Sequence, residues 1–131
     1  MPLRDAGIFA EYRNFIKNGI EHCRIILASD NIIRKQIRQA VKDTDSSAMV
    51  ILYGSRAKGS AKPDSDWDIM ILLDKPAVSI KDEQLFRHKL YDLELKIEAP
   101  ISTFVYSLHD WNNKLLHTPL HQSIEREGMI L

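Results

Sequence analysis

The sequence predicts an α/β fold in which helices pack against a small mixed β-sheet. Apolar runs indicate strands at residues 48–53, 66–73 and 101–106, and the segments around them repeat apolar residues at helical spacing. No internal repeat or linker interrupts this order. We expect one domain of 131 residues, with a core over residues 29–131 and an extra N-terminal helical extension over residues 1–28.

The composition is that of a globular protein, with 44% apolar and 27% charged residues. Eighteen basic residues balance eighteen acidic ones, so no net field favours duplex nucleic acid as a partner. Cys23 is the only cysteine, which excludes an intramolecular disulfide and a Cys-rich zinc site and fits a reducing compartment. Without a visible signal peptide or membrane span, we expect a cytoplasmic protein with no membrane partner.

The N-terminal quarter predicts two helices. Apolar residues recur three or four apart over residues 8–27, and Cys23 falls on this apolar stripe as a small buried side chain. The Ser-Asp-Asn run at residues 29–31 consists of N-cap types and predicts the start of a second helix, over residues 32–43. The first helix either adds to the core or forms the surface of a homodimer, and the sequence favours neither.

A long helix and a helical C-terminus flank the third strand. The long helix is expected over residues 79–98, because Pro100 disfavours helix in the residue before it. The C-terminal helical segment covers residues 109–127 and is interrupted near Pro119, with Gly128 as its C-cap. The direction of the third strand is left open.

Two aspartates, Asp66 and Asp68, open the second strand. Residues two apart in a strand point to the same face, so the two carboxylates are expected side by side. Burying such a pair is costly unless a positive charge compensates. Oxygen-only ligands favour Mg²⁺ or Mn²⁺, with water and phosphate oxygens completing the coordination. The pair therefore predicts a divalent metal site.

Gly54 and Ser55 follow the first strand and lead into a short helical turn over residues 56–58 that ends at Gly59. Gly54 allows the backbone to approach a ligand, Ser55 adds a hydroxyl, and the amides of a helix N-terminus favour an anion. A phosphate site beside a metal site predicts a nucleoside triphosphate as ligand.

The run GSRAKGSAKPDSDWD, residues 54–68, resembles the signature of the polymerase-β-like nucleotidyltransferase superfamily, and within it the small MNT-type (minimal nucleotidyltransferase) domains. The Gly-Ser pair, the Arg-Ala-Lys-Gly turn and the Ser-Asp-x-Asp sequence at the end of the motif all match. The likeness extends from about Asn31 to the C-terminus. The resemblance implies a nucleotidyltransferase-like fold. It also implies transfer of a nucleoside monophosphate from an NTP, with ATP as the expected donor, to a hydroxyl of a protein or small molecule.

The resemblance assigns roles to residues of the motif. Asp66 and Asp68 would be the catalytic ligands of Mg²⁺ or Mn²⁺. In the MNT subfamily the resemblance suggests a HEPN-type helical partner protein, in a toxin and antitoxin pair. The residues implied in nucleotide binding are Gly54, Ser55, Arg56, Lys58 and Ser65, with Lys62 as a further cation that could offset phosphate charge.

The third acid of the family has no counterpart in the third strand. By the pattern of that strand, Ser102 stands where the acid would be, and a neutral hydroxyl cannot act as the base. Two alternatives stay open. Either Glu94 or Glu98 reaches in from the preceding turn, or the protein is a catalytically weak or inactive nucleotide-binding, antitoxin-like interaction module.

The remaining polar and aromatic candidates predict packing. None of the five histidines lies in an HExxH motif. Trp67, between the two aspartates, is expected on the opposite face of the strand as part of the core.

Overall fold

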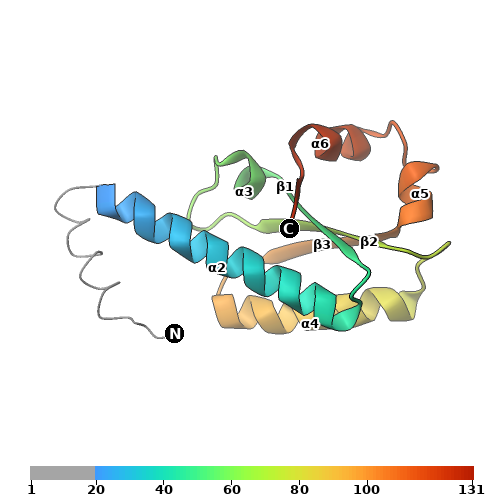
Figure 1. Cartoon of the computed structure of the whole chain (residues 1–131), viewed down its shortest axis with the longest axis horizontal. Helices are drawn as coiled ribbons and strands as arrows, with labels where there is room; N and C mark the ends of the chain where they lie inside the picture. The colour runs from blue at the N-terminus through green and yellow to red at the C-terminus, as the bar shows by residue number, and fades with distance from the viewer. Residues whose placement is uncertain (1–19) are drawn as a thin grey trace. The chain divides into compact units, whose positions relative to one another are not determined.

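The computed structural model describes residues 20–131 (Figure 1), and it describes side chains from residue 29 onward. The contacts divide the chain between Lys35 and Gln36, and the unit from Gln36 to Leu131 holds the sheet. In the described part of the chain, no helix has the length and apolarity needed to cross a membrane. The order of elements is α2, β1, α3, β2, α4, β3, α5, α6 and β4.

The first described element, α2 (Ile20–Thr44), is one continuous helix, so the predicted boundary at residues 29–31 is wrong. Ser, Asp and Asn are weak helix formers, but each destabilises a helix interior by less than about 1 kcal/mol, and the segment contains neither Gly nor Pro. The predicted helix over residues 8–27 and the predicted extension over residues 1–28 lie largely outside the described residues, as does the side chain of Cys23.

The two central strands are β1 (Met49–Tyr53) and β2 (Trp67–Leu73), and they pair antiparallel. Their register sets Tyr53 opposite Asp68. Between them lies the predicted helical turn, α3 (Ser55–Lys58). The end of β1 and the start of β2 therefore meet at one end of the sheet.

The edge strands make the sheet mixed. At one edge, β3 (Ile101–Ser107) runs parallel to β2, and at the other edge β4 (Met129–Ile130) runs antiparallel to β1. The strand order is β3-β2-β1-β4, which confirms the predicted mixed sheet. Strand β4 has no signal in the sequence, because two residues are too few to show a period.

The long helix, α4 (Ile80–Ile97), begins where the sequence predicts. Its N-cap Ser79 accepts a hydrogen bond from the backbone N–H of Asp82, and the carboxylate of Asp82 accepts one from the backbone N–H of Ser79. This reciprocal capping box satisfies two N–H groups at the helix start. The C-cap residue of this helix is Glu98, which adopts the left-handed conformation with φ of 55°.

The C-terminal helical segment forms two helices, α5 (Leu108–Asn112) and α6 (Pro119–Glu127). The interruption expected near Pro119 is real, but it is a non-helical stretch rather than a single break. Pro119 takes the first position of α6, where its missing N–H has no helical acceptor to lose. Gly128 occupies the C-cap position, as predicted.

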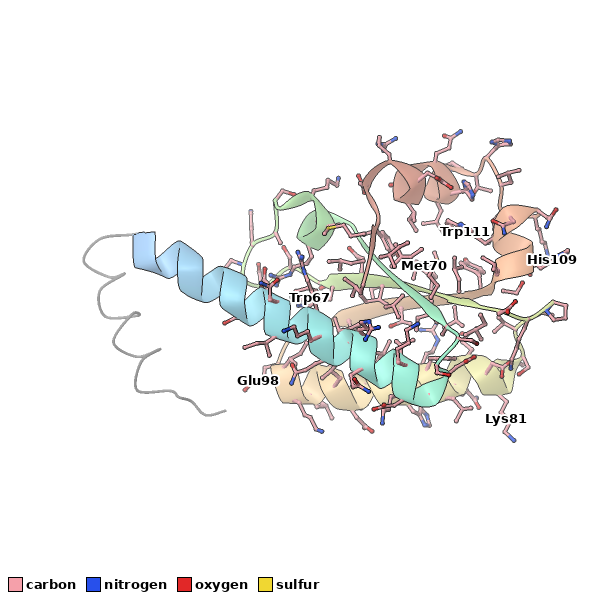
Figure 2. The ribbon with its side chains drawn as sticks, viewed as in Figure 1. Trp67, Met70, Lys81, Glu98, His109 and Trp111 are labelled. Carbon is pink, nitrogen blue, oxygen red and sulfur yellow. The ribbon has the colours of Figure 1, made fainter. Side chains whose placement is uncertain are left out.

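Helices cover both faces of the sheet: α4 lies along one face, and α3, α5 and α6 lie on the other (Figure 1). Trp67 is buried at 1% exposure on the face opposite Asp68, which confirms its predicted packing role. On the other face, Met70 and Trp111 belong to the cluster under α5 and α6 (Figure 2). The buried members of this cluster are Ile51, Met70, Leu72, Trp111 and Ile124.

Candidate active site

Gly54 forms the turn between β1 and α3. Its backbone has φ of 71° and ψ of −157°, a region that essentially only glycine populates. A Cβ atom at this position would overlap Oδ2 of Asp68 and would lie 3.0 Å from its Cγ. The absence of a side chain at Gly54 therefore lets the turn contact the carboxylate of Asp68 directly.

The first turn of α3 lies at the same end of the sheet. The carbonyl of Gly54 accepts hydrogen bonds from the N–H groups of Ala57 and Lys58, both at 3.1 Å, which closes the turn. At the other end, Gly59 has φ of 79° and caps the helix in the left-handed conformation. The start of a helix favours an anion, because its backbone N–H groups carry partial positive charge. Such an anion would sit next to Ser55, the first residue of α3.

Asp66 and Asp68 come close together at the start of β2. Asp66 is exposed and directly precedes the strand, whereas Asp68 is half-buried in it. Burial raises the pKa of Asp68 above its ordinary value, and the negative charge of Asp66 raises it further. Two carboxylates that repel each other in this way fit a divalent cation, because a cation bound between them would remove the repulsion.

Tyr53 is a residue of this site that was not among the predicted site residues. It lies opposite Asp68 across the β1–β2 pair, and its pKa is raised to about 12 by burial and then by the charges of Asp68 and Tyr106. Its phenol therefore stays protonated at neutral pH beside the carboxylate. In the sequence, only its position at the end of β1 could have pointed to the site. That position indicates a neighbour of Asp68 only when the pairing register of β1 and β2 is known.

The third acid is absent from the described residues. Ser102 on β3 lies opposite Asp68 in the parallel pair and is exposed. Glu94 is engaged elsewhere, because its Oε1 accepts a hydrogen bond of 2.8 Å from the N–H of Ile101. Glu98 caps the carboxyl end of α4 (Figure 2). No group of three His, Cys, Asp or Glu side chains with metal-binding geometry occurs within residues 29–131, so neither glutamate completes the site.

The loop between α3 and β2 is held by Arg56. Its Nη2 donates hydrogen bonds to the carbonyl oxygens of Ser65 at 2.9 Å and Pro63 at 3.2 Å. Its guanidinium lies 4.6 Å from the ring centroid of Trp67. The hydroxyl of Ser65 also accepts a hydrogen bond of 2.8 Å from the N–H of Lys62. Arg56 and Ser65 thus shape the loop that carries Asp66, and their contact with nucleotide stays a prediction.

Lys58 connects α3 to the C-terminal part of the fold. Its Nζ lies 3.6 Å from Oε2 of Glu127 on α6. Lys58 is the last residue of α3, and the ion pair directs its ammonium group toward α6. Its role in binding nucleotide stays a prediction.

We expect Arg56→Lys to lower the free energy of unfolding by about 1–3 kcal/mol. Lysine cannot reproduce the two hydrogen bonds from the guanidinium or its stacking on Trp67, and each such contact is worth about 1 kcal/mol. Urea unfolding followed by tryptophan fluorescence measures the change. Lys62→Ala, an exposed lysine in the same loop, is the control and should stay within about 0.5 kcal/mol of the wild type. Equal stability of the two variants would contradict the loop-holding role.

The raised pKa of Asp68 predicts that metal binding depends on pH. In the unfolded chain Asp68 loses its proton around its ordinary pKa of 3.8, whereas in the folded state it keeps the proton to a higher pH. The stability of the metal-free protein should therefore fall as pH rises from 3.8 through the folded-state pKa. Only the ionised carboxylate binds metal, so the rise in Tm caused by Mg²⁺ should grow over the same range. At a Mg²⁺ concentration one hundred times Kd, the stabilisation is about 2.7 kcal/mol.

Thermal unfolding over a pH series, with and without Mg²⁺, measures both trends. Asp68→Asn should remove the pH dependence and the response to Mg²⁺ together. Asp92→Asn changes an exposed aspartate on α4 and should keep both. A Mg²⁺ effect on Tm that persists in Asp68→Asn would contradict the prediction that Asp68 is a metal ligand.

Similarity to a known protein family extends over most of the chain. A family model described as a nucleotidyltransferase domain matches residues 34–131. The matched range contains the Gly54 turn, both aspartates and all four strands of the described sheet. No curated protein matches the chain.

Proposed function

The chain belongs to the nucleotidyltransferase domain family, and from this premise we propose that it transfers a nucleoside monophosphate from an NTP, with ATP as the expected donor, to a hydroxyl of a protein or small molecule in a metal-dependent reaction. Family membership supports nucleotidyl transfer as the general chemistry. One observation supports the finer proposal: the Gly54 turn packs directly against the carboxylate of Asp68, so the first residues of α3 lie next to that carboxylate.

In this proposal the site has metal ligands, phosphate contacts and a residue that holds the loop. Asp66 and Asp68 would hold Mg²⁺ or Mn²⁺, which when bound neutralises phosphate charge and activates the attacking oxygen. Ser55 and the amides at the start of α3 would hold the β- and γ-phosphates. Lys58 would offset their charge, and Arg56 would keep the Asp66 loop in place.

The proposal includes an MNT subtype with a HEPN-type helical partner protein. Its support is the likeness of residues 54–68 to the MNT signature. Co-expression with a small helical HEPN-like protein, followed by co-purification, tests the pairing. Failure of the two proteins to co-purify would contradict this part and leave the proposed chemistry standing.

Incubation with labelled ATP, Mg²⁺ and candidate acceptors tests the transfer. We expect label on an acceptor with the wild type and at least a hundredfold less with Asp66→Asn, because the variant loses one of only two carboxylates. Asp64→Asn, an exposed aspartate in the same loop, is the matched control and should retain activity. If none of the four NTPs supports transfer and Asp66→Asn matches the wild type, the proposal is wrong.

A second candidate function is a catalytically weak or inactive nucleotide-binding module that acts as an antitoxin-like interaction partner. The observation that favours it is Ser102, which lies opposite Asp68 and offers no carboxylate. Titration calorimetry with Mg²⁺ and ATP distinguishes the two, since this candidate predicts binding without release of pyrophosphate.

A further inference from the structure

Two aromatic residues, Phe104 and Tyr106, lie on the same face of the sheet as Asp68. Alternation along β3 places Ser102, Phe104 and Tyr106 on this face, and Ser102 lies opposite Asp68. Phe104 is 40% exposed, although the neighbouring Met70 is fully buried. An exposed phenylalanine two residues beyond the partner of Asp68 marks this part of the surface as a binding candidate.

The ring of Phe104 is held in place from one side. It stacks on Tyr106 with 6.2 Å between ring centroids and 16° between ring planes, and Tyr106 packs against the buried cluster under α5 and α6. With strands about 4.8 Å apart and a rise of about 3.3 Å per residue, Phe104 lies about 8 Å from Asp68. This separation matches the size of a small acceptor whose hydroxyl lies at the carboxylates.

The in-line geometry of phosphoryl transfer indicates that the acceptor binds at this surface. With the β- and γ-phosphates at α3, beside β1, and the α-phosphate at Asp66 and Asp68 on β2, the leaving pyrophosphate lies on the β1 side. The attacking and leaving oxygens lie roughly in line, so the acceptor oxygen arrives from the β3 side. It bonds to the α-phosphorus as the bond to pyrophosphate breaks, and the hydroxyl proton passes to solvent.

The charge distribution restricts the acceptor class. No charged residue occurs in β3, whereas Arg56, Lys58 and Lys62 lie on α3 and the loop at the phosphate side. We infer that Phe104 and Tyr106 bind a neutral acceptor through a flat apolar group next to its hydroxyl, rather than a phosphate-bearing one. This inference rests on the proposed function, because that function sets the order of phosphates and acceptor across the sheet.

Ligand-observed saturation-transfer NMR tests the inference without requiring turnover. The protein carries Mg²⁺ and a non-hydrolysable ATP analogue, and the probes are benzyl alcohol, glycerol and ribose 5-phosphate. We expect a signal for benzyl alcohol alone, because only this probe combines a flat apolar ring with a hydroxyl. Replacing Mg²⁺ with Mn²⁺ should broaden the benzyl alcohol resonances and so locate the probe near the carboxylates.

Variants at one position separate ring stacking from folding. Phe104→Leu keeps apolar volume and should lower the benzyl alcohol signal at least fivefold, whereas Phe104→Tyr keeps a flat ring and should retain it. Tyr91→Ala removes an aromatic that is 57% exposed on α4 and is the control that should retain the signal. An undiminished signal in Phe104→Leu, or a stronger signal for ribose 5-phosphate, would overturn the inference.

The proposed function can fail separately. Calorimetry with Mg²⁺ and inorganic triphosphate reports on Asp66, Asp68 and the start of α3 alone. If triphosphate does not bind, the proposed function is wrong and the assignment of an acceptor surface falls with it. If triphosphate binds and benzyl alcohol gives no signal, only the acceptor inference is overturned.

Discussion

Gly54→Ala should lower the affinity for Mg²⁺ and ATP at least tenfold and reduce the free energy of unfolding by about 1–3 kcal/mol. The stability loss follows from the backbone of Gly54, whose φ of 71° and ψ of −157° suit only glycine. The affinity loss has a different cause: the new methyl group would occupy the space of the Asp68 carboxylate, which must then move away from Asp66. Calorimetry measures the affinity, and urea unfolding measures the stability.

Gly59→Ala is the matched control for this prediction. Gly59 also has a positive φ, of 79°, but a Cβ atom there would meet nothing within 4 Å. The variant should lose about 1–2 kcal/mol of stability from backbone strain and still bind nucleotide like the wild type. If both alanine variants lost affinity equally, backbone strain rather than displacement of Asp68 would explain the loss.

The sequence predicted the elements whose signals are local. The turn at Gly54, the α3 helix that stops at Gly59 and the start of α4 after Ser79 each depend on residues within a few positions of one another. The apolar runs of β1 and β2 were predictable for the same reason, since buried central strands need side chains that pack on both faces.

The features that sequence reasoning missed depend on tertiary pairing. The two residues of β4 become a strand only by pairing with β1, and Tyr53 becomes a neighbour of Asp68 only through the register of that sheet. The helix boundary expected at residues 29–31 failed because N-cap residues are also tolerated inside a long helix. The register of strand pairing thus determines which residues become neighbours, and no short sequence segment specifies that register.

The contacts of Arg56 likewise depend on tertiary structure that the sequence does not specify. Its place in the motif predicts a contact with phosphate, whereas the structure shows its guanidinium bonded to the carbonyl oxygens of Pro63 and Ser65. A cation seven to nine residues from its acceptors finds them only after the loop has closed. The structure therefore shows Arg56 holding the loop that carries Asp66, and its contact with phosphate stays a prediction.

Ser102→Asp should raise the rate of nucleotidyl transfer by about a hundredfold, the lower end of what one positioned acid or base contributes. The variant side chain would join Asp66 and Asp68 from the neighbouring strand, because Ser102 pairs with Asp68 and is exposed on the same face. Without metal the variant should be less stable than the wild type, since like charges directly opposite each other repel. Mg²⁺ should reverse that loss by binding between the carboxylates.

Ser102→Asn separates charge from size, because asparagine has nearly the volume of aspartate but cannot act as a base. Single-turnover transfer of labelled ATP and thermal unfolding with and without Mg²⁺ distinguish the variants. A matching gain in Ser102→Asn would show that the missing carboxylate is not the limitation. If Ser102→Asp gains metal affinity without gaining turnover, the position serves binding alone, and the nucleotide-binding module becomes the better account of the wild-type chain. If both increase, β3 already has the geometry of a complete site, and the hydroxyl of Ser102 alone keeps the wild type slow.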